Sequence, residues 1–363
     1  MYGLDIATGA RLFAPVQLAG AQQYEPACYQ NGPAAAVCVT ATDPTIGNHL
    51  VVSVLDLDRG TTTFTGPTDF NSFGTLHVGS SLPSGSHPRL IRVGNYRGES
   101  RLVASVEDKG VYGVGPHADL TWFAPGNGQV LVPNDLQVTN TPPLTLAVGG
   151  PTDSDPKFRV FSVIDGTDLT PTAPPHTVLK RAIVYNGGYA YQYEEGNTSA
   201  GVLFYDTTGQ LVARQHADHY PVLLDNAAMP IILDAGTFRV YTATGRLLAS
   251  IPADSAYTYS PSFQAIGTKL FAWLNYSNGE HWQQRDLLTG KPQNTCAINL
   301  SDYIGSDGRI VLTDNDAGMM IASEMSTCHT LWKIPIRDWI IEQVGTTLIR
   351  ESRDEIMAFQ RAS

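Results

Sequence analysis

The stretch Leu4-Asp5-Ile6-Ala7-Thr8-Gly9-Ala10-Arg11-Leu12-Phe13 decides the fold. It predicts a hairpin, because an Asp side chain can accept bonds from turn amides and Gly takes the left-handed conformation that closes the turn. The pattern returns at residues 55–60, 205–209, 241–245 and 286–290, with weaker copies at 122–128 and 164–166. The chain is therefore expected to repeat one structural unit.

The spacing of the copies indicates the size of that unit. Their glycines fall at Gly9, Gly60, Gly128, Gly166, Gly209, Gly245 and Gly290. Six intervals cover 281 residues, so the mean repeat is about 47 residues. Short alternating apolar runs fill the intervals, and no amphipathic helix of twelve residues is evident. Repeats of 40–50 residues with four strands each are typical of a β-propeller. We therefore expect an all-β chain that folds as a single β-propeller over residues 1–363.

The two ends of the chain predict how the ring closes. Residues 337–363 contain two or three strands but no final turn and strand, and residues 1–13 supply that piece. Together they make one blade of ordinary length. This count favours eight blades, with a ring closed by pairing of the N- and C-terminal segments. Seven blades remain the alternative, because residues 65–128 are irregular.

The repeat resembles that of the pyrroloquinoline-quinone-like (quinoprotein-type) β-propellers, whose blades carry an Ala-Leu-Asp-x-x-Thr-Gly-x-x-x-Trp motif. Asp, Thr and Gly of that motif match at residues 5, 8 and 9 and again at 286, 289 and 290. Tyr205 and Tyr241 stand in place of the Asp, and Phe13 and Phe64 in place of the Trp. The resemblance implies a propeller fold over most of the chain.

The enzymes of that superfamily hold a quinone and Ca²⁺ in the central channel. They are larger, with adjacent cysteines and regular tryptophan docking motifs, and this chain has neither feature. The resemblance therefore implies a non-enzymatic branch without a cofactor.

The four cysteines fall into two pairs. Cys28 and Cys38 flank a turn signal at Asn31-Gly32-Pro33, and Cys296 and Cys328 lie 32 residues apart. We expect two disulfides, each stabilising by roughly 3–4 kcal/mol in the chain-entropy model. Four buried thiols are the alternative, while zinc-type spacing is absent. Disulfides favour an extracytoplasmic location, periplasmic or at the cell surface. Since no signal peptide is visible, this location requires that a signal or membrane anchor has been removed.

Few residues point to chemistry. No Gly-x-Ser-x-Gly or His-Glu-x-x-His motif occurs, and no catalytic, cofactor or metal residue is assigned. His216, Asp218 and His219 form the one segment with metal-ligand character and are retained as binding candidates, although a solvated rim loop is the favoured interpretation. Tyr189, Tyr191 and Tyr193 alternate along one strand, so their rings share a face. Packing between blades is favoured over stacking against a sugar or peptide.

Charge and composition restrict the function. The net charge of −11 and the isoelectric point near 5.2 argue against a nucleic-acid partner, and no apolar run reaches the 18 residues of a membrane span. We expect a non-enzymatic scaffold of a bacterial cell envelope, similar to the lipoprotein that assists outer-membrane assembly. Its partner would be an envelope or membrane protein, contacted through loops at 65–74, 80–88 and 170–177. The alternative is a small-ligand or glycan binder using the central channel, followed by a channel-sited hydrolase or dehydrogenase.

Overall fold

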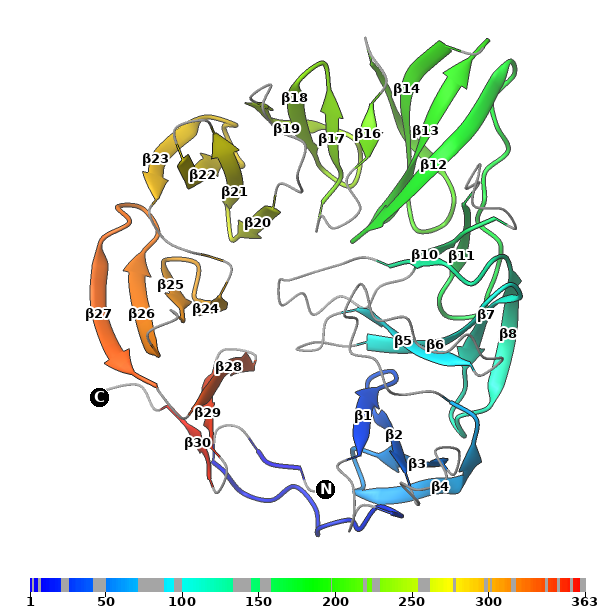
Figure 1. Cartoon of the computed structure of the whole chain (residues 1–363), viewed down its shortest axis with the longest axis vertical. Coiled ribbons are helices and arrows are strands. Elements are labelled where there is room, and N and C mark those ends of the chain that lie inside the picture. Colours follow the sequence, from blue (N-terminus) through cyan, green and yellow to red (C-terminus); the bar gives the residue numbers. More distant parts are fainter. Residues whose placement is uncertain are drawn as a thin grey trace.

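The computed structural model is a ring of β-sheets (Figure 1). The structure describes residues 1, 3–5, 8–20, 26–41, 50–70, 88–94, 100–132, 145–150, 158–196, 198–217, 221–223, 229–253, 262–276, 279–296, 300, 302–314, 318–336, 339–344, 347–352 and 355–359. Every named element in these ranges is a strand, and no helix in them is suited to crossing a membrane.

Eight sheets follow one another in chain order, and we number them as blades 1 to 8. Blade 1 contains β1 (Ala27–Gln30), β2 (Ala35–Ala41), β3 (Leu50–Asp56) and β4 (Thr61–Thr68). Blade 2 contains β5 (Arg89–Gly94), β6 (Ser100–Val106), β7 (Gly110–Val114) and β8 (Leu120–Pro125). Blade 3 contains β9 (Val130–Leu131), β10 (Thr145–Val148) and β11 (Arg159–Ser162). Blade 4 contains β12 (Thr177–Tyr185), β13 (Gly188–Glu195), β14 (Thr198–Tyr205) and β15 (Leu211–His216).

The second half of the chain continues the pattern. Blade 5 contains β16 (Val222–Leu223), β17 (Ile231–Asp234), β18 (Thr237–Tyr241) and β19 (Leu247–Pro252). Blade 6 contains β20 (Ser262–Ile266), β21 (Lys269–Tyr276), β22 (Gly279–Asp286) and β23 (Pro292–Cys296). Blade 7 contains β24 (Tyr303–Ser306), β25 (Ile310–Thr313), β26 (Met319–Glu324) and β27 (Thr330–Pro335). Blade 8 contains β28 (Ile340–Val344), β29 (Thr347–Glu351) and β30 (Ile356–Ala358). Neighbouring strands within each blade are antiparallel.

The prediction of an all-β propeller is confirmed. Eight sheets agree with the favoured blade count, and the N-terminal segment lies between β30 and blade 1 (Figure 1). The described strand pairings give β30 only β29 as a neighbour. The N- and C-terminal segments are therefore neighbours in the ring, but no ladder that joins them is among these pairings, so their pairing stays a prediction.

The core of the molecule lies between blades. Seven clusters of buried apolar side chains join the consecutive pairs from blades 1 and 2 to blades 7 and 8. Val54 and Leu102 meet in the first of them, for example, and Ile304 and Ile341 in the last. Because each of blades 2 to 7 buries both faces against its neighbours, its strands are apolar on both sides.

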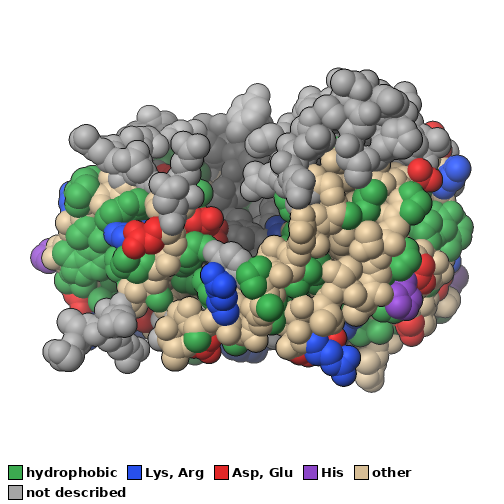
Figure 2. Space-filling view, turned by 90° about the horizontal axis from the view of Figure 1, so that it is seen from below, with side chains coloured by type: hydrophobic (Ala, Val, Ile, Leu, Met, Phe, Trp, Pro, Cys, Tyr) green, Lys and Arg blue, Asp and Glu red, His purple; other side chains and the backbone are tan. Residues whose placement is uncertain are grey.

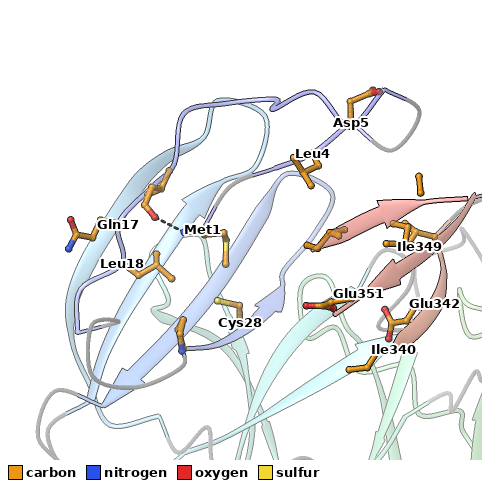
Figure 3. A pocket seen from close by; sticks show the side chains of 16 residues that line it. Met1, Leu4, Asp5, Gln17, Leu18, Cys28, Ile340, Glu342, Ile349 and Glu351 are labelled. Atoms are coloured by element: carbon orange, nitrogen blue, oxygen red, sulfur yellow. Dashed lines mark hydrogen bonds between the residues drawn. The ribbon is translucent and has the colours of Figure 1, made fainter. Parts of the chain in front are cut away.

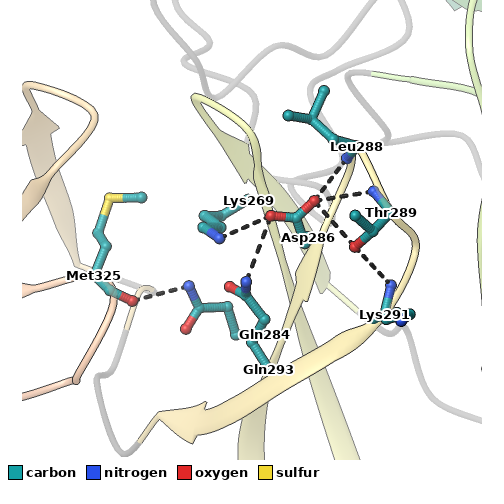
Figure 4. Close-up of polar contacts among 8 residues, drawn as sticks. All are labelled: Lys269, Gln284, Asp286, Leu288, Thr289, Lys291, Gln293 and Met325. Carbon is teal, nitrogen blue, oxygen red and sulfur yellow. Dashed lines mark hydrogen bonds and ion pairs between the residues drawn. The ribbon is translucent and has the colours of Figure 1, made fainter.

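The repeated turn connects the third and fourth strands of a blade, and we call it the corner turn. In blade 6, the Asp286 carboxylate accepts bonds from the amides of Leu288 and Thr289, at 2.9 and 3.0 Å, and from the Thr289 hydroxyl at 3.2 Å (Figure 4). Lys269 binds the other carboxylate oxygen at 3.0 Å. Gly290 closes the turn with φ +68°, a conformation that favours glycine.

Two details of the predicted repeat are wrong. In blades 4 and 5 the turn acceptors are Asp206 and Thr242, one residue after the tyrosines that were aligned with Asp. These turns are one residue shorter, so Tyr205 and Tyr241 point into the core and are 3% exposed. The copy at 122–128 is not a corner turn either, because blade 2 turns at residues 115–119 and Gly128 follows β8.

The first predicted disulfide is present. Cys28 and Cys38 are opposite each other on β1 and β2 and are bonded, so the turn at residues 31–34 does place the two sulfurs face to face. Cys328 is also disulfide-bonded. Cys296 ends β23, and its side chain lies outside the described part of the structure. The second pairing therefore stays a prediction.

Removing the first disulfide by Cys28→Ala with Cys38→Ala should lower the free energy of unfolding by about 3 kcal/mol, since the bridge restricts the unfolded chain. Urea unfolding of this double variant and of the parent measures the loss. If the variant and the parent unfold at the same urea concentration, the bridge does not stabilise the ring.

Candidate functional site

The predicted metal-ligand segment is only partly visible. His216 ends β15 and is exposed, whereas Asp218 and His219 lie outside the described residues. Among the residues that the structure describes, no group of three His, Cys, Asp or Glu side chains is arranged to hold a metal ion. These three residues remain untested binding candidates.

The tyrosine row on β13 packs between blades 3 and 4, as favoured from the sequence. Tyr189, Tyr191 and Tyr193 are at most 1% exposed. The hydroxyls of Tyr189 and Tyr191 each donate to a blade 3 carbonyl at 2.6 Å, those of Leu169 and Phe158. Burial raises the pKa of both phenols well above the ordinary range. The row fixes two blades together, and Tyr191 also contributes to the lining of a cavity among blades 2, 3 and 4.

The corner turns instead carry an exposed apolar set. A Leu or Ile lies in or within three residues of seven such turns, counting that of the N-terminal segment, and these side chains are 42–76% exposed. We call this set the corner belt: Leu12, Leu120, Ile164, Leu211, Leu247, Leu288 and Leu331. Because the blades share one strand order, their corner turns lie on the same side of the ring. The belt therefore follows one edge of the molecule.

Carboxylates accompany the belt. Asp165, Asp206 and Asp286 lie in the corner turns beside Ile164, Leu211 and Leu288. The Thr208 hydroxyl, followed by turn amides, lowers the pKa of Asp206, and Lys269, followed by the Thr289 amide, lowers that of Asp286. These groups stay ionised at neutral pH, so at least three of the seven turns place a negative charge near an apolar belt residue, whereas the exposed Arg246 directly precedes Leu247.

The turn carboxylates predict an acid-dependent loss of stability. A pKa lowered by folding contributes stability above the unfolded value near 3.8, and that stability is lost as the pH falls through the folded value. Asp206→Asn keeps a turn acceptor but cannot titrate. We expect the urea midpoint of this variant to fall less steeply than that of the parent below about pH 4. Asp58→Asn is the matched control, and parallel curves for parent and Asp206→Asn would contradict the prediction.

A cavity of 930 Å³ lies between blade 8 and the first residues of the chain (Figure 3). Leu18 and Cys28 line one side, and Ile340, Glu342 and Glu351 line the other. We call this space the seam. Figure 2 shows the ring from below relative to Figure 1. A recess lies in the middle of this face, and hydrophobic and acidic side chains lie to its left.

A second cavity, of 650 Å³, lies among blades 2, 3 and 4. Its lining includes three basic residues, Lys109, Arg159 and Lys180, of which Arg159 and Lys180 form ion pairs with Asp168 and Glu194.

Sequence reasoning missed the corner belt and the seam. Three loops were expected to make contacts. In the first, residues 65–68 belong to β4 and residues 71–74 lie outside the described part of the chain. In the second, residues 80–87 lie outside it as well, whereas residues 170–176 of the third are described and lead into β12. A signal for the belt was present, because a leucine follows the turn glycine by two residues at both Leu211 and Leu247.

Comparison with known families agrees with this geometry. Residues 1–361 match the family described as the conjugation-associated nine-bladed β-propeller domain. This chain belongs to that family. In the part of the chain that the structure describes, the conjugation-associated propeller has eight sheets, one fewer than the family description counts. Its resemblance to the quinoprotein-type repeat stays a prediction.

Known relatives extend the comparison. An uncharacterized protein of Mycolicibacterium smegmatis (strain MKD8) is 31% identical over 376 residues, a match that spans 98% of the conjugation-associated propeller and 72% of that protein. The computationally designed Ika8 protein is similar with a TM-score of 0.44 and 12% identity, over 92% of this chain and 97% of that one. BamB from Moraxella catarrhalis gives a TM-score of 0.39 and 11% identity, over 90% and 81% of the two chains.

Proposed function

We propose that this chain is a non-enzymatic scaffold that docks protein partners of conjugative DNA transfer on the extracytoplasmic side of a bacterial envelope. The observation that carries the proposal is the corner belt, because repeated exposed apolar side chains on a rigid ring are typical of an interaction surface. Family membership supports the link to conjugation. The proposal includes two further points: the blades are related to the quinoprotein-type repeat, and the protein is tethered to a membrane.

The chemistry of the belt indicates the kind of partner. Ionised turn carboxylates such as Asp206 and Asp286 lie near belt residues, and the whole chain carries a net charge of −11. Such a surface repels a DNA backbone and attracts a protein segment with apolar and basic residues. The disulfide between Cys28 and Cys38 supports placement outside the reducing cytoplasm.

Polar substitution of the belt should reduce conjugation. We expect Leu211→Ser combined with Leu247→Ser and Leu288→Ser to lower the transfer frequency from donor cells at least about tenfold, which corresponds to 1.4 kcal/mol of lost binding. These side chains are 47–76% exposed, so the variant should fold. Mating assays with equal amounts of folded protein measure the effect.

The matched control is Val178→Ser, which removes an equally exposed apolar side chain on β12, away from the corner turns. We expect normal transfer from this strain. Normal transfer by the folded triple variant would reject the proposal. Loss of binding to lipid vesicles, rather than to protein, would identify the belt as a membrane surface instead.

A further inference from the structure

The proline-rich segment that joins blades 3 and 4 has no part in the corner belt. It reads Thr170-Pro171-Thr172-Ala173-Pro174-Pro175-His176-Thr177, so threonine and proline make up six of its eight residues. The structure describes the whole segment. Segments that combine threonine or serine with proline are typical of O-glycosylated chains. The composition therefore makes these threonine hydroxyls candidate glycan acceptors.

The backbone of this segment lies outside the β-ladders of the two blades. Residues 170–174 belong to no strand, and β12 begins only at Thr177. The prolines favour an extended backbone in the residues before them. Both ends are fixed, because the Thr170 amide donates to the Asp168 carboxylate at 3.0 Å and the Thr177 amide donates to the Pro174 carbonyl at 3.0 Å. An enzyme can therefore bind the residues between these points without opening a blade.

The three threonines of the segment differ in what their hydroxyls contact. Thr170 is half-buried, and its hydroxyl accepts a bond from the Val160 amide at 3.0 Å. Thr177 is half-buried as well, and its hydroxyl donates to the Pro174 carbonyl at 2.6 Å. Thr172 is exposed, and among the described residues its hydroxyl has no partner. Of these three threonines, Thr172 is therefore the one whose hydroxyl is free to react.

Thr172 lies toward the edge of the ring opposite the corner belt. The segment leads into the start of β12, and β12 ends beside the corner turn of blade 5, where the Tyr185 hydroxyl donates to the Ala243 carbonyl at 3.4 Å. The length of β12 therefore separates Thr172 from the corner turns. A glycan on Thr172 would leave the belt uncovered.

We propose that Thr172 is an O-glycosylation site, an inference that rests on the extracytoplasmic location in the proposed function. The co-substrate is an activated sugar, a hexose joined through its anomeric carbon to a phosphate. The Thr172 oxygen forms a bond to that carbon while the bond between the carbon and the phosphate oxygen breaks. The phosphate leaves with the electron pair of that bond, and the hydroxyl proton passes to a base of the transferase. The transfer involves no oxidation or reduction.

Peptide mapping by mass spectrometry tests the site in the protein purified from its native host. We expect the peptide that contains Thr172 to carry the mass of one or more hexoses, and mild alkali to release them by β-elimination. Thr172→Ala should lose the whole mass increment, whereas Thr172→Ser, which keeps a hydroxyl, should retain it. Thr62→Ala is the matched control, because Thr62 is exposed but is held in the ladder of β4. We expect this variant to keep the full increment at residue 172.

A fusion of alkaline phosphatase to the chain separates this inference from the proposed function, because the phosphatase is active only outside the cytoplasm. An active fusion together with unmodified Thr172, or with sugar on Thr62 in place of Thr172, would overturn the site and leave the docking role of the belt standing. An inactive fusion would reject the extracytoplasmic scaffold, and the glycosylation site with it.

Discussion

Tyr191→Ala is expected to lower the free energy of unfolding by about 3–5 kcal/mol, the usual cost of truncating a buried aromatic side chain to alanine. Tyr191 is 1% exposed and lies between blades 3 and 4, where its ring packs edge-on against Tyr189 and Tyr205 at 6.1 and 6.3 Å between centroids. Its hydroxyl donates to the Phe158 carbonyl at 2.6 Å. The substitution removes a blade-to-blade contact and leaves a cavity.

The control for this prediction is Tyr191→Phe. It keeps the ring and removes only the bond to Phe158, so we expect a loss of about 1–2 kcal/mol. Urea unfolding followed by tyrosine fluorescence or circular dichroism measures both variants. If the two substitutions cost the same, the stability of this junction comes from the hydrogen bond and not from packing of the ring.

Gly201→Ala should cost about 3 kcal/mol or more, because backbone strain and steric overlap add. Gly201 lies in β14 with φ +147°, and a Cβ there would stand 2.0 Å from the carbonyl oxygen of Gln215 on β15. Relief requires the outer strand of blade 4 to move away from its neighbour. The loss is measured as the change in urea midpoint.

Gly196→Ala is the matched control. Gly196 also has a positive φ, +55°, but a Cβ there would meet nothing within 4 Å. Only the cost of the left-handed conformation applies, about 1–2 kcal/mol. Equal losses at Gly196 and Gly201 would show that steric contact between β14 and β15 contributes nothing.

The repeat could be predicted from the sequence because its turns need particular residues. Asp286 and Gly290 are required by bonding and by backbone conformation, so their spacing is visible without a structure. The turns of blades 4 and 5 were aligned one residue too early. In these shorter turns the acceptors are Asp206 and Thr242, and the Tyr before each acceptor points into the core. The sequence does not show which of the two turn lengths a blade uses, because the turn ends in the same Thr-Gly pair in both cases.

The candidate surfaces were harder to predict. Whether Leu211 and Leu247 are buried or exposed depends on the bulge after the corner turn, which a pattern of apolar residues does not reveal. The seam could not be predicted from segment lengths, because residues 337–363 and 1–13 add to one blade whether or not they pair.

The docking role of the corner belt is tested most directly by photo-cross-linking in conjugating donor cells. A photoreactive amino acid would replace Leu247 on the belt or, as the control, Val178 on β12, both of which are exposed to a similar extent. We expect position 247 to form a discrete adduct with a protein encoded by the conjugative element, and position 178 to form none. Absence of any protein adduct at 247, in cells that transfer DNA normally, would contradict the proposed scaffold.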